Sequence, residues 1–97
     1  MKIDLSKFGT TLVSRPSGKE AFLALKTLLT NLKTNEKIEI DFSKVIVFTP
    51  SWADEFITPL IKTYGKKVVL LNTENLSVQA TLKILKESAE APESQGT

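Results

Sequence analysis

Within residues 36–42, polar and apolar residues alternate strictly from Lys37 to Asp41, which is the pattern of a β-strand with one buried face. A second apolar run, residues 45–48, either extends this strand after a bulge or lines the core as a loop. Residues 67–71, Lys-Val-Val-Leu-Leu, form a short aliphatic run between Gly65 and Asn72. This run is typical of a fully buried strand, and we expect it to pair in parallel with the first strand.

Apolar residues recur at helical spacing in three other segments. The first helix is predicted over residues 17–33, where Ser17 and Glu20 have the spacing of a capping box after Pro16. Its apolar face holds Phe22, Leu25, Leu28, Leu29 and Leu32.

The second helix is predicted over residues 51–64, with Ser51 as its N-cap and Gly65 after its end. Its apolar face holds Trp52, Phe56, Leu60, Ile61 and Tyr64. Pro59 lies inside this helix and removes the hydrogen bond to the Glu55 carbonyl, so we expect a kink or a break there.

The third helix is predicted over residues 75–86, with Asn75 as its cap. Residues 88–97 hold no large apolar side chain, which predicts a disordered acidic tail after a domain of residues 1–87. Residues 2–5 and 11–13 are expected to be extended. The resulting fold class is α/β, a small mixed sheet of about three to five strands with about three helices packed on it.

The composition limits the catalytic and metal-binding chemistry open to the chain, because the chain contains no cysteine and no histidine. Disulfides, thiolate nucleophiles, imidazole or thiolate metal sites and a histidine base are therefore excluded. No glycine-rich nucleotide loop is present. The neighbouring carboxylates of Asp54 and Glu55 diverge by about 100° on a helix and do not form a catalytic pair. We expect a non-enzymatic domain without a metal or cofactor.

A chain of 97 residues can build one hydrophobic core. No signal-peptide run or membrane-length apolar segment occurs, so a cytoplasmic location is expected. The net charge is +2 and the lysines are scattered, which does not favour nucleic-acid binding. An exposed edge of a small sheet leaves a homodimer open.

The segment before the first predicted helix has the chemistry of an anion site. A helix N-terminus with a guanidinium, hydroxyls and a glycine could hold a phosphate or a carboxylate. The candidate residues are Ser14, Arg15, Ser17 and Gly18. The alternative is an ordinary capped helix whose Arg15 pairs with Asp54 or Glu55.

Residues 49–55, Thr-Pro-Ser-Trp-Ala-Asp-Glu, form a predicted strand-to-helix corner rich in functional groups. Structural roles also account for them: Trp52 as a core residue, Ser51 as a cap, and Asp54 and Glu55 as compensation for the helix dipole. A buried Trp52 with both carboxylates bonded to the backbone or Arg15 would make the corner architectural. An exposed Trp52 beside free carboxylates would favour docking.

Three short motifs carry a resemblance to a known family. They are Ser14-Arg15, Asp41-Phe42-Ser43-Lys44-Val45 and Ala53-Asp54-Glu55. Over about residues 2–86 the chain resembles the STAS family of anti-sigma factor antagonists, and more closely the STAS-like branch of uncharacterised bacterial domains (DUF4325).

The resemblance implies a signalling role. In anti-sigma factor antagonists an Asp-Ser-Ser/Thr-Gly loop follows the strand, and a partner kinase phosphorylates its second hydroxyl. Alignment from Asp41 places that hydroxyl at Ser51, whereas Thr49, Pro50 and Trp52 replace the acid, the first hydroxyl and the glycine. The implied partner is a histidine-kinase-like ATPase or a serine kinase.

The expected function is a non-enzymatic regulatory or adaptor domain that docks a protein partner through residues 49–56. The expected partner-binding residues are Ser51, Trp52, Asp54 and Glu55, with Ser51 as the residue that could be phosphorylated. The alternative is a small-anion or nucleotide sensor that binds at the helix N-termini near Arg15 and Ser51.

Overall fold

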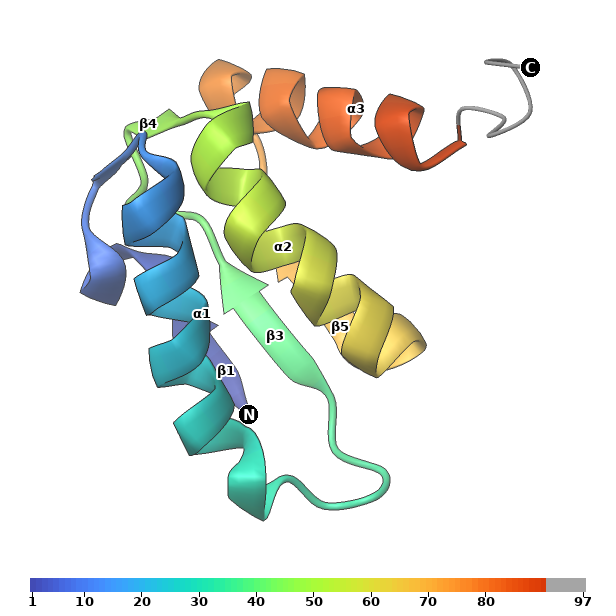
Figure 1. Cartoon of the computed structure of the whole chain (residues 1–97). Coiled ribbons are helices and arrows are strands. Elements are labelled where there is room, and N and C mark those ends of the chain that lie inside the picture. The colour runs from blue at the N-terminus through green and yellow to red at the C-terminus, as the bar shows by residue number, and fades with distance from the viewer. Residues whose placement is uncertain (91–97) are drawn as a thin grey trace.

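The computed structural model describes residues 1–90. Their strands and α-helices are, in order, β1 (Lys2–Asp4), β2 (Thr11–Leu12), α1 (Arg15–Leu28), β3 (Ile38–Asp41), β4 (Val47–Phe48), α2 (Pro50–Tyr64), β5 (Val68–Leu71) and α3 (Leu76–Glu90). Short 3-10 turns lie at Leu5–Phe8, Leu29–Asn31 and Gly65–Lys67. The predicted α/β class is confirmed (Figure 1).

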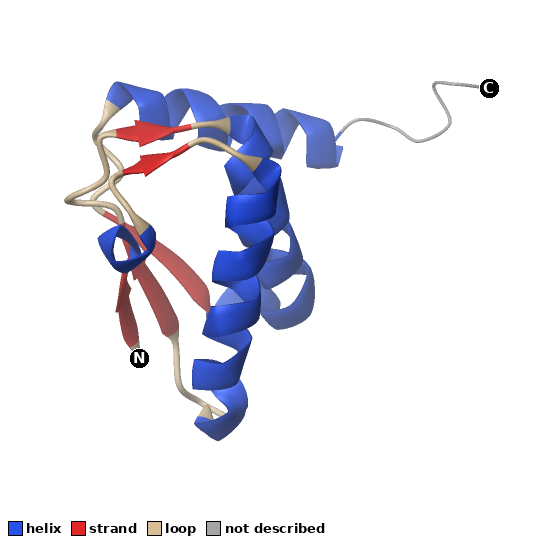
Figure 2. Ribbon diagram, turned by 60° about the vertical axis from the view of Figure 1, so that its left-hand side comes forward, coloured by secondary structure: helices blue, strands red, loops and turns tan. Residues whose placement is uncertain are grey.

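The strands form two separate parallel sheets rather than one mixed sheet (Figure 2). The larger has three strands in the order β1-β3-β5, and the smaller pairs β2 with β4. The Thr10 carbonyl accepts hydrogen bonds from the amides of Ile46 at 2.8 Å and Val47 at 3.1 Å. The apolar run at 45–48 therefore neither extends β3 nor remains a simple loop, because it turns away to pair with β2.

Helices α1 and α2 lie side by side over one face of the larger sheet (Figure 2). The register aligns Ile3 with Ile40 and Ile40 with Leu70, and this apolar row faces the helices. Lys2 and Glu39 form part of the opposite row. The alternation predicted for β3 is confirmed and separates a core face from a polar face.

Helix α1 begins at Arg15, two residues earlier than predicted. Its N-cap is Ser14, whose Oγ accepts a hydrogen bond from the Ser17 amide at 3.2 Å. The predicted capping box of Ser17 and Glu20 is therefore wrong. Leu28, placed on the predicted core face, is exposed.

Helix α2 begins at Pro50, so Ser51 lies inside the first turn and is not the N-cap. The hydroxyl of Thr49, the residue before the helix, donates to the Leu12 carbonyl at 3.1 Å. The helix continues through Pro59 to Tyr64, and the predicted break does not occur. Gly65 ends it with a φ of 53°, as the sequence predicted.

Asn75 caps α3 as predicted, since its Oδ1 accepts hydrogen bonds from the amides of Ser77 at 2.7 Å and Val78 at 3.1 Å. Two hydroxyls of α3 then bond the backbone of β4. The Ser77 Oγ accepts from the Phe48 amide at 2.8 Å, and the Thr81 Oγ1 donates to the Phe48 carbonyl at 2.6 Å. Helix α3 thus acts as the second partner of β4.

Helix α3 extends to Glu90, three residues beyond the predicted end of the domain at residue 87. The remainder of the predicted tail, residues 91–97, lies outside the described residues. No helix within residues 1–90 has both the length and the apolar character needed to cross a membrane.

The contact between α1 and α2 depends on Gly18. A Cβ atom at this position would lie 2.5 Å from the Trp52 carbonyl oxygen and 3.1 Å from the Trp52 Cα. Both atoms belong to the backbone of α2, so they cannot rotate away. Only glycine permits this approach of the two helices.

Replacing Gly18 with alanine tests this contact. In a helix interior the change normally stabilises by about 0.5–1 kcal/mol, because alanine restricts the unfolded chain. Here we expect the opposite sign, a loss of about 1–3 kcal/mol of unfolding free energy from overpacking. Urea unfolding followed by the fluorescence of the single tryptophan measures it.

The control is Lys19→Ala on the exposed part of the same helix, which should stay within about 0.5 kcal/mol of the original chain. A Gly18→Ala variant as stable as the original chain would show that the helices can separate without cost.

Candidate functional site

Trp52 is fully buried, with 0% of its surface exposed. Its indole stacks on Phe56 with ring centroids 4.8 Å apart and meets the edge of Phe48 at 5.8 Å. Its Nε1–H donates to the Ser17 Oγ at 3.2 Å. The prediction that Trp52 contacts a partner is therefore wrong, because the residue fills the space between α1 and the core.

Arg15 joins the starts of the two helices through a charged triplet. Its Nη1 donates to the Asp54 Oδ2 and to the Glu55 Oε2, each at 3.0 Å. The side chains of Arg15, Asp54 and Glu55 remain 55%, 44% and 31% exposed. Asp54 also accepts a hydrogen bond from the Thr58 hydroxyl at 3.0 Å.

These contacts shift the pKa values of Arg15 and Asp54 so that the ionised form of each is favoured. Hydrogen bonds to Asp54 and Glu55 raise the pKa of Arg15. The hydrogen bond from Arg15 lowers the pKa of Asp54 below its ordinary value of 3.8, and Thr58 adds to the effect. With Trp52 buried and both carboxylates bonded to Arg15, the corner has an architectural role, while the three charged side chains remain partly in solvent.

Ser51 differs from Trp52, Asp54 and Glu55 because its side chain is not bonded to another part of the described chain. It lies in the first turn of α2 and is partly exposed. Its hydroxyl makes no hydrogen bond to any of the described residues. Of the predicted partner-binding residues, Ser51, Asp54 and Glu55 therefore reach the surface.

The predicted anion-binding residues are all engaged within the chain. Ser14 caps α1, Arg15 holds the two carboxylates, and Ser17 accepts from the indole of Trp52. Gly18 is buried, and its amide donates to the Ser14 carbonyl at 3.0 Å. Gly18 therefore serves helix packing, which corrects its predicted role at an anion site.

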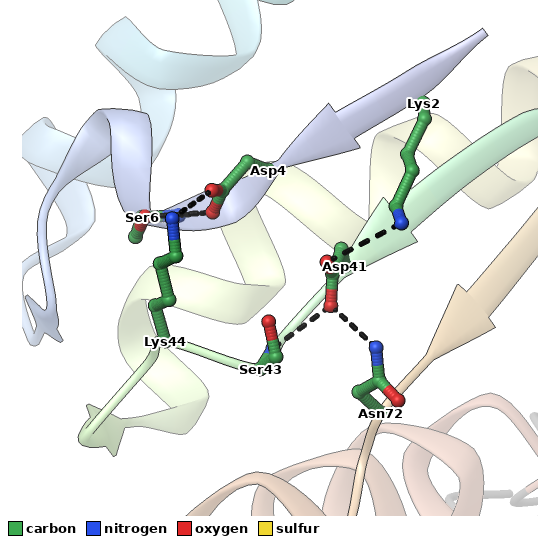
Figure 3. Close-up of polar contacts among 7 residues, drawn as sticks. All are labelled: Lys2, Asp4, Ser6, Asp41, Ser43, Lys44 and Asn72. Atoms are coloured by element: carbon green, nitrogen blue, oxygen red, sulfur yellow. Dashed lines mark hydrogen bonds and ion pairs between the residues drawn. The ribbon is translucent and has the colours of Figure 1, made fainter.

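Polar contacts that the sequence analysis missed lie near the carboxyl ends of the three strands of the larger sheet (Figure 3). The Asp41 Oδ1 accepts hydrogen bonds from the Ser43 amide at 2.9 Å and the Asn72 Nδ2 at 2.8 Å. Its Oδ2 lies 3.8 Å from the Lys2 Nζ. These contacts, led by the bond from Asn72, lower the pKa of Asp41.

Asp4 makes further polar contacts at these strand ends. It accepts from the Ser6 hydroxyl at 2.6 Å and the Ser6 amide at 3.0 Å, which lower its pKa, and it lies 3.3 Å from the Lys44 Nζ. The signal in the sequence was an aspartate at the end of both strands. Because the carboxylates are bonded within the chain, these contacts tie β1, β3 and β5 together rather than presenting a free site.

Within residues 1–90 no group of three or more histidine, cysteine, aspartate or glutamate side chains is placed to hold a metal ion. One concave surface of the described residues is instead largely apolar. A groove of about 470 Å³ lies between α2, β5 and α3. A smaller hollow of about 210 Å³ shares Thr58, Lys62 and Leu85 with it and reaches Asp54, so the groove is continuous with the corner.

The parallel sheets, the covering helices and the strand-to-helix corner define a small α/β domain. The family model of the STAS-like domain of unknown function (DUF4325) matches residues 25–79, more than half of the chain. The chain therefore belongs to this family. The matched region includes the motifs at residues 41–45 and 53–55. No curated protein and no solved structure matches the chain in the corresponding comparisons.

The charged triplet predicts a specific dependence of stability on pH. Because the pKa of Asp54 is lowered in the folded chain, its ionised form stabilises the fold above the unfolded-state pKa. That contribution is lost as the pH falls through the lower folded-state value. We expect Arg15→Gln to reduce the melting temperature near pH 7, and the difference from the original chain to shrink below about pH 4.

Thermal unfolding followed by circular dichroism across this pH range measures the difference. Lys19→Gln removes a charge from the same helix without touching the triplet and serves as the control. The linkage would be contradicted by a difference in melting temperature between Arg15→Gln and the original chain that stays constant down to about pH 2.

Proposed function

We propose that this STAS-like domain is a non-enzymatic regulatory or adaptor module that docks a protein partner through the corner at residues 49–56, with Arg15 alongside. The observation that carries the proposal is the accessible triplet of Arg15, Asp54 and Glu55. Its three charged groups are fixed relative to one another at the junction of two helices, yet each remains partly in solvent. Such a pattern can be read by a complementary protein surface.

Two features favour docking over catalysis. The polar side chains at both helix starts, Ser51 excepted, are bonded within the chain, and Asp54, which borders the smaller hollow, is held by Arg15 and Thr58. The groove between α2, β5 and α3 is lined largely by apolar side chains and contains no acid–base pair. The nucleotide or anion sensor has no structural observation in its favour, because Ser14, Arg15, Ser17 and Gly18 are already engaged.

Ser51 supplies a means of regulation within the same proposal. A phosphate there would add about −1.5 to −2 charges in the first turn of α2, where the helix dipole favours negative charge. It would also compete with Asp54 and Glu55 for the Arg15 guanidinium. Modification would therefore rearrange the charges that the partner reads, and a serine kinase or a histidine-kinase-like ATPase is the proposed partner class.

A comparative pull-down tests the docking surface. The original chain and the double variant Asp54→Lys, Glu55→Lys are immobilised and exposed to a lysate of the source cells, and retained proteins are identified by mass spectrometry. We expect one protein retained by the original chain to be lost from the double variant, because the charge of the corner is reversed.

Glu74→Lys provides the control, since Glu74 is exposed in the loop between β5 and α3 and forms no ion pair with the described residues. It should retain the same protein. Circular dichroism of each variant verifies folding. An identical set of retained proteins for the folded double variant and the original chain would refute docking through the corner.

A further inference from the structure

The outer edge of β5 is a free sheet edge within the described residues, because the strand order is β1-β3-β5 and β5 pairs only with β3. The Phe42 amide donates to the Leu71 carbonyl at 3.0 Å. In a parallel ladder alternate residues bond the same neighbour, so Val69 and Leu71 point their backbone groups toward β3. Those of Leu70 point outward and bond no described residue.

The side chain of Leu70 lies beside this free edge. It forms part of the floor of the groove of about 470 Å³, between Ile57 and Ile61 on α2 and Leu82 and Leu85 on α3. An unpaired backbone edge and an apolar groove therefore lie side by side along one strand. A further strand placed beside β5 would bond Leu70 and direct alternate side chains into the groove.

We propose that the β5 edge and the adjoining groove accept an extended segment of an acidic partner protein as an added strand, with alternate apolar residues in the groove. Backbone pairing would supply affinity and the groove would select the side chains, as in other cases of strand addition.

The acidic character of the segment follows from the charges around the β5 edge and the groove. Lys62 and Lys86 line the groove, and Lys66 and Lys67 directly precede β5. No described carboxylate lies within ion-pair distance of any of these lysines. A second copy of the chain would bring the same lysines to the edge, so charge complementarity favours an acidic partner over self-association.

This surface does not rest on docking through the corner. The apolar lining of the groove and the β5 edge do not include Asp54 or Glu55, so the pull-down with the corner variant and the peptide test can fail separately.

The test uses the full chain and a short fluorescein-labelled peptide in which valine and glutamate alternate, with binding measured by fluorescence anisotropy. We expect the peptide to bind, and Ile61→Glu to weaken binding by on the order of tenfold or more, because a carboxylate would be buried in the groove. The matched control is Ile84→Glu. Ile61 and Ile84 are equally exposed at 45%, but Ile84 does not line the groove.

Amide hydrogen exchange separates strand addition from other modes of binding. We expect the Leu70 amide to exchange rapidly in the free chain and to become protected when the valine–glutamate peptide is bound. Binding without this protection would show that the groove is filled by a segment that does not pair with β5, and would overturn the proposal.

Three further outcomes also overturn it. The first is no binding of the valine–glutamate peptide to the folded chain. The second is equal binding of a peptide in which lysine replaces glutamate, which would remove the basis for an acidic partner. The third is protection of the Leu70 amide in the free chain that rises with protein concentration, which would assign the edge to a second copy.

Discussion

The close approach of α1 and α2 at Gly18 determines how the rest of the domain is arranged. The absence of a side chain at Gly18 allows the Trp52 backbone to lie directly against α1. The indole of Trp52 then stacks on Phe56 and donates to Ser17. Because the inward face of the first turn of α2 is committed to this contact, Ser51, Asp54 and Glu55 are turned outward. The corner can therefore be recognised only through charge and hydroxyl groups, and not through its tryptophan.

The same contact explains the charged triplet. It brings the first turns of α1 and α2 together, which places Arg15 within reach of both Asp54 and Glu55. Exposed ion pairs contribute only about 0–1 kcal/mol to stability, so a partner could compete for these groups at little cost to the fold. Their fixed geometry still restricts which surfaces can match them. An ion pair of structural origin is in this way compatible with a role in recognition.

Local sequence signals predicted the elements that depend on nearby residues. Helix α2 and its end at Gly65 follow from periodicity and a glycine, and the Asn75 cap follows from side-chain chemistry. The predictions were wrong where contacts with residues distant in the sequence determine the local structure. Ser17 is drawn to the Trp52 indole and leaves capping to Ser14, and the segment at 45–48 pairs with β2 across the chain.

The groove was missed for a related reason. Leu60 and Ile61 are adjacent on a helix and point about 100° apart, so the apolar pattern alone does not decide whether both are buried. Periodicity placed both on the core face, but the packing of α1 against α2 buries Leu60 and leaves Ile61 at the edge of the groove. Which of two neighbouring apolar residues is buried depends on where the second helix lies. That position is set by the Gly18 contact, which no local pattern reveals.

The free sheet edges of the described residues differ in how they are protected from further pairing. The β4 edge is closed by hydroxyls of α3, namely Ser77 and Thr81. The β1 edge carries the charged residues Lys2 and Asp4, a common defence against unwanted strand addition. Only β5 is aliphatic throughout, partly exposed along its whole length and bordered by an apolar groove. An edge of this kind promotes aggregation unless it is covered. A strand added to β5 would cover this edge, whereas the β1 and β4 edges are already protected by residues of the domain itself.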